Sequence, residues 1–137
     1  MYLFDTNIFL EILLGQEKAD ICHKALEVLS EEKPGWISSF SLHAIEAILG
    51  SSGKRERAEI LPIFLESLRE HPYLSWYATT IEEELEVARL APQVKLDFDD
   101  TLQYYVAKKK KLSLVTLDGD FKKVKDIAII SPKEMGF

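Results

Sequence analysis

The chain opens with MYLFDTNIFLEILLG, residues 1–15, and this stretch decides the fold class. Residues 2–5 are a short apolar run that fits a buried strand. Residues 7–14 are too apolar all round for a surface helix, so we expect a helix that is largely covered. Gly15 fits the position just past its end. A buried strand followed at once by a buried helix is typical of a parallel sheet covered by helices.

The rest of the chain repeats this alternation. Helical spacing of apolar residues predicts helices over 17–31, 41–49 and 54–70, and two more that start at Thr80 and Asp97. Strands are predicted over 36–38, 73–78, 112–117 and 127–130. We expect Ser41 to cap its helix, a break at 50–53, an interruption or kink at Pro62 and a helix end at Pro92. The pattern predicts one α/β domain, residues 1–137, with a mostly parallel central sheet flanked by helices.

Composition narrows the class of protein. The 137 residues are 47% apolar and 29% charged, which is ordinary for one globular domain with a core. No run approaches the roughly 18 apolar residues of a membrane span, and the first residues do not resemble a signal peptide. Cys22 is the only cysteine, so an internal disulfide and a cysteine-rich zinc site are both excluded. We therefore expect a cytoplasmic protein without a membrane partner.

Acidic residues stand where the predicted strands end and helices begin. Asp5 follows the first strand, Asp118 follows strand 112–117, and Asp100 lies one turn into the helix that Asp97 opens. Glu46 lies beside the apolar stripe of helix 41–49, where a carboxylate is costly unless it is paired or reaches solvent. The functional crevice of such a sheet lies beyond the carboxyl ends of its strands. Carboxylates gathered there repel one another unless a cation joins them, and oxygen donors without His or Cys select Mg²⁺ or Mn²⁺.

Each of these acids also has an ordinary structural explanation. Asp5 fits an N-cap or a turn before the helix that follows it. Asp97 is interpreted mainly as an N-cap, and Asp99 as a solvent-facing residue. One member of the pair Asp118 and Asp120 can simply make the turn, and we favour Asp118 as a ligand because it is nearer the strand end.

The charged residues give two opposite indications about a nucleic-acid partner. A net charge of −6 argues against a nucleic-acid partner. The basic residues are nevertheless grouped, in the runs 54–57, 108–111 and 122–125. These groups are either a track for a phosphate backbone or solvated helix ends.

Four segments together resemble the PIN-domain ribonucleases, and their order and the chain length resemble the VapC-like toxin branch of toxin–antitoxin pairs. They are FDTNI at 4–8, the helix from Ser41 to Glu46, DFDDT at 97–101 and VTLDGDF at 115–121. The similarity spans essentially the whole chain. Thr101 departs from the family, which more often has Ala there.

The resemblance implies a three-layer α/β/α fold and a Mg²⁺- or Mn²⁺-dependent ribonuclease. The positions that match the family's metal-binding acids are Asp5, Glu46, Asp100 and Asp118. It also implies that Thr116 supports the last acid, that Asn7 is the polar residue after the first, and that Asp97 and Asp120 are possible auxiliary ligands. Expected partners are RNA, an antitoxin that inserts a segment into the groove, and a second copy of the chain.

Two other functions stay open at this point. Asp5 could be the nucleophile of a phosphatase or phosphotransferase, although Asn7 stands where such enzymes need a second Asp. The acids could also only cap helices, in a binding module without catalysis.

Overall fold

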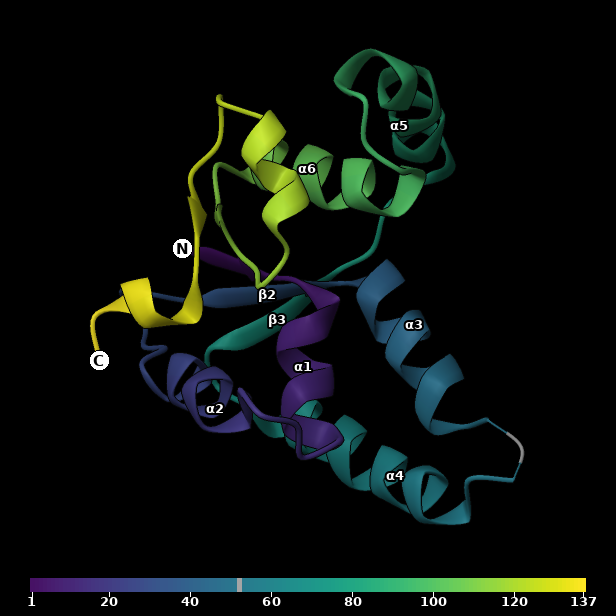
Figure 1. Cartoon of the computed structure of the whole chain (residues 1–137), viewed down its shortest axis with the longest axis vertical. Coiled ribbons are helices and arrows are strands. Elements are labelled where there is room, and N and C mark those ends of the chain that lie inside the picture. The colour runs from purple at the N-terminus through teal and green to yellow at the C-terminus, as the bar shows by residue number, and fades with distance from the viewer. Residues whose placement is uncertain (52) are drawn as a thin grey trace.

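Five parallel strands form one sheet in the order β3-β2-β1-β4-β5 (Figure 1). The computed structural model describes residues 1–51 and 53–137. The strands are β1 (Tyr2–Phe4), β2 (Gly35–Ser38), β3 (Leu74–Tyr77), β4 (Ser113–Val115) and β5 (Ile129–Ile130). The predicted fold class, a mostly parallel sheet flanked by helices, is confirmed.

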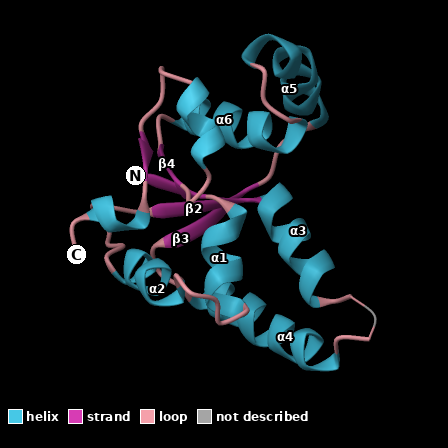
Figure 2. Ribbon diagram, viewed as in Figure 1, coloured by secondary structure: helices cyan, strands magenta, loops and turns pink. Residues whose placement is uncertain are grey.

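Helices cover both faces of this sheet (Figure 2). They are α1 (Thr6–Leu13), α2 (Ala19–Glu27), α3 (Ser39–Leu49), α4 (Arg55–Glu70), α5 (Ile81–Val94) and α6 (Phe98–Lys110), with short 3₁₀ turns η1 (Gly119–Lys123) and η2 (Pro132–Met135). One layer contains α1 to α4 and the other α5 and α6, which gives the three-layer arrangement. Along the described parts of the chain, none of these helices combines the length and apolar character that crossing a bilayer requires.

Neighbouring strand residues point to opposite faces of the sheet and so feed two separate cores. Phe4 and Val115 pack in the cluster beneath α1 to α4, whereas Leu3 and Leu114 pack in the cluster beneath α5 and α6. All four side chains are fully buried. This explains why the residues of β1 and β4 that feed the two cores are apolar on both faces of the sheet.

The order of the strands places a switch point between β1 and β4. The strand that follows β1 in the chain, β2, lies on one side of it, and the strand that follows β4, β5, lies on the opposite side. Crevices in parallel sheets form between two neighbouring strands whose connections lead to opposite sides in this way. Phe4 pairs with Val115, and the backbone N–H of Asp5 donates to the carbonyl of Val115 at 2.9 Å. The residues that follow β1 and β4 therefore lie side by side.

Several predicted helix boundaries were wrong. Ser38, not Ser41, caps α3, because the Ser38 hydroxyl accepts the backbone N–H of Ser41. Pro62 does not interrupt α4, which is continuous from Arg55 to Glu70. Pro92 lies in the last turn of α5, so the helix continues to Val94 and ends at Lys95, whose φ is 60°. The break expected at 50–53 includes residue 52, which lies outside the described residues.

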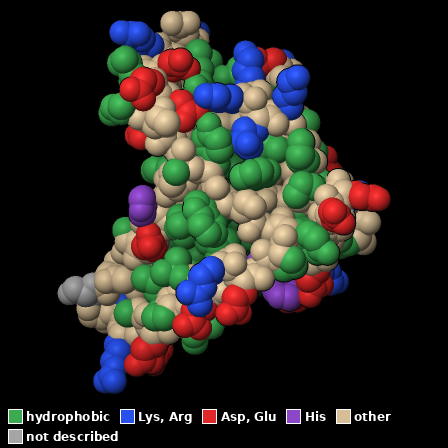
Figure 3. All heavy atoms as spheres, turned by 180° about the vertical axis from the view of Figure 1, so that it is seen from behind, with side chains coloured by type: hydrophobic (Ala, Val, Ile, Leu, Met, Phe, Trp, Pro, Cys, Tyr) green, Lys and Arg blue, Asp and Glu red, His purple; other side chains and the backbone are tan. Residues whose placement is uncertain are grey.

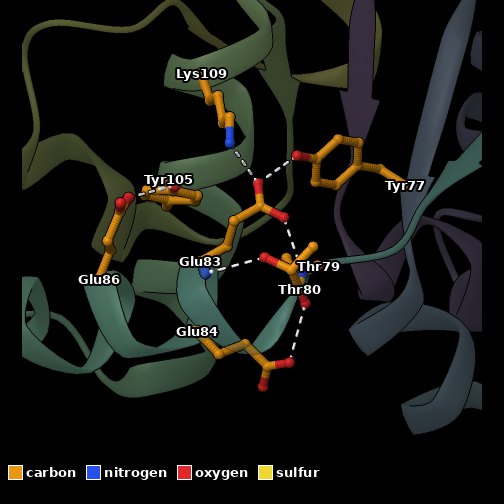
Figure 4. Close-up of polar contacts among 8 residues, drawn as sticks. All are labelled: Tyr77, Thr79, Thr80, Glu83, Glu84, Glu86, Tyr105 and Lys109. Carbon is orange, nitrogen blue, oxygen red and sulfur yellow. Dashed lines mark hydrogen bonds and ion pairs between the residues drawn. The ribbon is translucent and has the colours of Figure 1, made fainter.

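A polar cluster joins α5 to the sheet and to α6 (Figure 4). The buried Glu83 accepts hydrogen bonds from the Tyr77 hydroxyl on β3 and from the Lys109 ammonium on α6, at 2.7 Å for the latter. It also closes a capping box with Thr80 at the start of α5. Burial raises the pKa of Glu83, but these bonds outweigh burial and lower the pKa to about 2. The cluster therefore holds a charged carboxylate between three elements.

We expect Glu83→Gln to destabilise the protein by about 1–2 kcal/mol near pH 7, discounted because Lys109 is half exposed. A lowered folded pKa stabilises the protein above the unfolded value of 4.5, and this stabilisation is lost as the pH falls toward 2. Urea unfolding between pH 7 and pH 2.5 should show the difference from wild type shrinking in acid. Glu84→Gln is the matched control, because Glu84 is held only by the Thr79 hydroxyl. A difference that does not change with pH would contradict the role of the Glu83 charge.

Candidate active site

A cavity of about 340 Å³ lies at the switch point, between α1, α3 and the beginning of α6. In the space-filling view of Figure 3 the outline of the molecule is indented between the parts that contain α5 and α3. Six carboxylates line the cavity: Asp5, Asp97, Asp99, Asp100, Asp118 and Asp120. Apolar side chains form part of the opposite wall: Leu10, Phe40, Ala44 and Ile48. The predicted crevice beyond the strand ends therefore exists and is strongly acidic.

Asp5 is the most enclosed of these acids, with 6% of its surface exposed. It is the N-cap of α1, and its Oδ1 accepts the backbone N–H of Thr6 at 2.8 Å. Oδ1 also accepts from Nε2 of Gln103 at 3.3 Å, and Oδ2 accepts from the Thr116 hydroxyl at 2.7 Å. Burial raises the pKa of Asp5, the three donors lower it, and nearby Asp118 raises it further. Asp5 is thus both a cap and a cavity acid, so the two interpretations of it are compatible.

Asp100, Asp118 and Asp120 form the tightest acidic group. One oxygen from each carboxylate lies within 4.8 Å of the other two. Burial, and after it the charges of Asp99, Asp118, Asp5 and Asp97, together raise the pKa of Asp100 to about 6. Such mutual repulsion is what a bound cation relieves.

Thr116 and the turn after β4 connect the first acid to the last. The Thr116 hydroxyl accepts the backbone N–H of Asp118 at 2.9 Å and gives its own proton to Asp5. The predicted support of the last acid is therefore made through the Asp118 backbone, while the side-chain bond goes to Asp5. The Asp118 carboxylate accepts the N–H of Asp120 at 2.9 Å, so it makes the turn and also faces the cavity.

Glu46 is the predicted ligand that the structure does not bring to the other acids. The face of α3 that lines the cavity carries Phe40, Ala44 and Ile48, which are spaced four residues apart. Glu46 is two residues from Ala44, a turn of about 200° around the helix axis. Its Oε1 lies 3.9 Å from Nε2 of His43, and about a third of its side chain is exposed.

Asp97 occupies the position expected of it, but the interpretation of its side chain was wrong. It is the N-cap residue of α6, yet its carboxylate makes no capping hydrogen bond. The carboxylate lines the cavity instead. Asp99 is exposed, as predicted, and it too reaches the cavity rim while accepting the N–H of Asp100 at 3.2 Å. Asn7 is exposed at the same rim.

Two buried polar residues of the site, Gln103 and Ser41, were not predicted from the sequence. Nε2 of Gln103 donates to Ser41 Oγ at 2.6 Å and so joins α6 to α3. A signal existed, because Gln103 is a polar residue inside an apolar helical stretch, three positions after Asp100 and therefore on the same side of the helix. Ser41 was predicted only as a helix cap.

The donor set fits a hard divalent cation. Within the described residues of this cavity the donors are carboxylate, hydroxyl and amide oxygens, which suit Mg²⁺ or Mn²⁺. The fold and the site together define a class of protein. It is a three-layer α/β protein with oxygen donors at the switch point of its sheet. The PIN domain family model matches residues 2–127, and the chain belongs to this family.

Solved structures of similar fold agree with this assignment. The structure of VapBC2 from Rickettsia felis bound to a promoter DNA fragment matches with a TM-score of 0.73 at 20% identity, over 95% of this chain and 97% of that one. Mycobacterium tuberculosis VapC20, described as a sarcin-ricin loop cleaving toxin, matches with a TM-score of 0.75 at 14% identity, over 95% and 99%. FitAcB from Neisseria gonorrhoeae matches with a TM-score of 0.68 at 18% identity, over 97% and 99%. No curated protein sequence matches this chain.

Proposed function

We propose that this protein is a Mg²⁺- or Mn²⁺-dependent endoribonuclease, and that it is the toxin of a toxin–antitoxin pair. The observation that carries the proposal is the convergence of Asp5, Asp100 and Asp118 on one cavity at the switch point of a PIN domain. The similar chain of VapC20, whose description names an RNA loop as its target, supports RNA as the substrate.

The residues of the cavity would have different roles in this function. Asp100, Asp118 and Asp120 would hold the cation, because their oxygens already lie close together, and Asp5 would complete the group from the strand end. Bound Mg²⁺ or Mn²⁺ would supply the activation of water and the neutralisation of charge that phosphodiester hydrolysis needs. Thr116 fixes the Asp5 carboxylate and the Asp118 backbone at once, so the two sides of the site keep one geometry.

The two other functions have less support. A phosphatase of that kind needs a second Asp two residues after its nucleophile, and this chain has Asn7 at that position. A binding module whose acids only cap helices would leave no reason for the Asp97 carboxylate to turn from its helix to the cavity. Calorimetry of the purified protein with Mn²⁺ separates the proposals, because a protein that binds no Mn²⁺ and cuts no RNA would not be this nuclease.

The basic run 108–111, one of the groups considered above as a track for RNA, makes other contacts in the structure. Lys108 pairs with Asp126 at 2.8 Å, Lys109 pairs with Glu83, and Lys110 lies 4.3 Å from the centre of the Trp36 ring. Lys108 is also eight residues from Asp100 along α6, about 12 Å at 1.5 Å per residue. This run therefore has structural roles at the far end of the helix, although Figure 3 shows basic side chains gathered on that part of the surface.

Lys122 and Lys123 are better placed to meet RNA. They lie two and three residues after Asp120 in η1, and Lys123 donates to the carbonyl of Lys95, two residues before Asp97. We expect the double variant Lys122→Ala/Lys123→Ala to raise the KM for RNA at low salt. It should also reduce the slope of log KM against log salt by about 1.4, since each phosphate contact on a single strand contributes about 0.7.

A salt titration of cleavage between 50 and 300 mM KCl measures this change. The matched control is Lys108→Ala/Lys110→Ala, which removes the same charge from the far end of α6 and should leave the slope close to wild type. Equal effects of the two double variants would assign the attraction to net charge and not to a track beside the cavity.

The proposed partners follow from similar proteins. The similar structure from Klebsiella pneumoniae is a toxin–antitoxin complex by its description, and the one from Rickettsia felis is described as VapBC2 bound to promoter DNA. We propose an antitoxin partner and a homodimer for this chain as well. Light scattering of the purified protein measures its oligomeric state, and a small neighbouring reading frame with a DNA-binding pattern would identify the antitoxin.

A further inference from the structure

Gln103 lies at the centre of the site although nothing in the family motifs singles it out. It is 1% exposed in the middle of α6, and it lines the acidic cavity. Its amide nitrogen bridges two elements, donating to Ser41 Oγ on α3 at 2.6 Å and to Asp5 Oδ1 after β1 at 3.3 Å. The amide therefore ties Asp5 to two helices that are far apart in sequence.

The hydrogens of this network can be assigned by counting. Ser41 Oγ accepts from Gln103 and from the Ser38 hydroxyl, which lies 3.1 Å away. Its single proton then goes to Thr6 Oγ1, 2.8 Å away. The proton of Thr6 stays free, and Thr6 lines the cavity. The chain of hydroxyls thus runs from the buried end of β2 to the cavity wall.

The same count fixes the orientation of the Gln103 amide. In the reversed orientation its carbonyl oxygen would face the Asp5 carboxylate, so two acceptors would meet without a hydrogen between them. In the observed orientation both amide hydrogens are used. Oε1 is then buried without a partner among the described residues. A buried carbonyl without a hydrogen bond lowers the stability of the folded protein by about 1–3 kcal/mol unless a group in the cavity donates to it.

We propose that Gln103 is the positioning residue for the cation of this site. Its amide nitrogen holds the Asp5 carboxylate in one orientation toward the cavity, and its free carbonyl oxygen accepts a hydrogen bond from water in the filled cavity. Gln103 does not contact the reacting phosphate, so it acts through Asp5 and through this water. The proposal rests on the proposed metal-dependent function and goes beyond it, because Gln103 is neither an acid nor a position of the family motifs.

The test is Mn²⁺ binding by calorimetry, with Mn²⁺ as the only ligand. Gln103→Met keeps the length of the side chain and removes both hydrogen-bonding groups. We expect its Kd for Mn²⁺ to rise about 10- to 100-fold, the range for residues that orient metal ligands. The KM for RNA at saturating Mn²⁺ should not change, since the residue does not touch the substrate. Gln93→Met is the matched control, because Gln93 is exposed on α5 and bonds only to its own helix at Arg89.

Ser41→Ala provides a second, milder variant. It removes the acceptor that holds Gln103 but leaves the Gln103 side chain in place, so we expect a smaller rise in the Kd for Mn²⁺, of about 3- to 10-fold. If Gln103→Met does not fold, this variant decides the question. Thermal unfolding without metal reports folding separately from binding.

The outcomes test the role of Gln103 separately from the proposed nuclease function on which it rests. Wild-type protein that neither binds Mn²⁺ nor cuts RNA would overturn the proposed function, and this role with it. Wild-type protein that does both, beside a folded Gln103→Met with an unchanged Kd, would overturn only the role of Gln103. With Gln103→Met unfolded, an unchanged Kd in Ser41→Ala would do the same.

Discussion

Asp5→Asn is expected to reduce RNA cleavage by at least about 100-fold, the upper loss seen for residues that merely orient a metal ligand. Asp5 is a cavity acid in its own right, so losing its charge removes a ligand for the cation. The substitution preserves size and keeps one oxygen that can accept the Thr6 N–H. Because burial raises the pKa of Asp5, the charge itself is not what holds the fold together. Thermal unfolding without metal should therefore change little.

The matched control is Asp20→Asn, an exposed acid in the first turn of α2 on a different part of the surface. It changes the net charge by the same amount and should leave cleavage at the wild-type rate. Both variants need purification that excludes contaminating nucleases. Cleavage by folded Asp5→Asn at the wild-type rate would mean that Asp5 only caps α1.

The fold was predictable in part because the central strands β1 and β4 are largely buried on both faces. Residues 2–4 and 114–115 are apolar on both faces, a pattern typical of a strand covered by helices on each side. The helix ends were harder. Pro92 lies in the last turn of α5, which continues to Val94, so this proline did not mark the end of the helix as predicted.

The acids after strands were predictable for a related reason, whereas residues on helices were not. Asp5 and Asp118 follow β1 and β4, and topology alone brings the carboxyl ends of adjacent parallel strands together. Glu46 needed the rotation of α3 to be known, and that rotation is set by packing that directs Ala44 to the cavity. Gln103 needed the same knowledge of α6. A capping position, as at Asp97, likewise does not say where the side chain points.

Asp100→Asn is expected to stabilise the metal-free protein while abolishing Mn²⁺ binding and cleavage. The folded pKa of Asp100 is raised to about 6 from an ordinary value of 3.8. A raised pKa means that the charged form is less favourable in the folded protein. Stability is therefore lost as the pH rises from about 4 through 6, and the loss is complete at neutral pH. Removing the charge should raise the free energy of unfolding by about 1–2 kcal/mol at pH 7.5, a value reduced to allow for the partial exposure of the group.

Urea unfolding in EDTA at pH 7.5 and pH 4 measures this effect, and most of the gain should disappear at pH 4, where Asp100 is protonated in the folded state and about half protonated in the unfolded state. Glu46→Gln is the matched control, because it removes one partly exposed carboxylate that does not line the cavity. It should not stabilise the protein, and a gain equal to that of Asp100→Asn would show that general acidity, not the crowded cavity, opposes folding. With saturating Mn²⁺ the order should reverse: wild type gains stability by binding, and Asp100→Asn does not. A site that destabilises the empty protein and stabilises the loaded one is built for a cation, and this reversal is a property that helix-capping acids would not have.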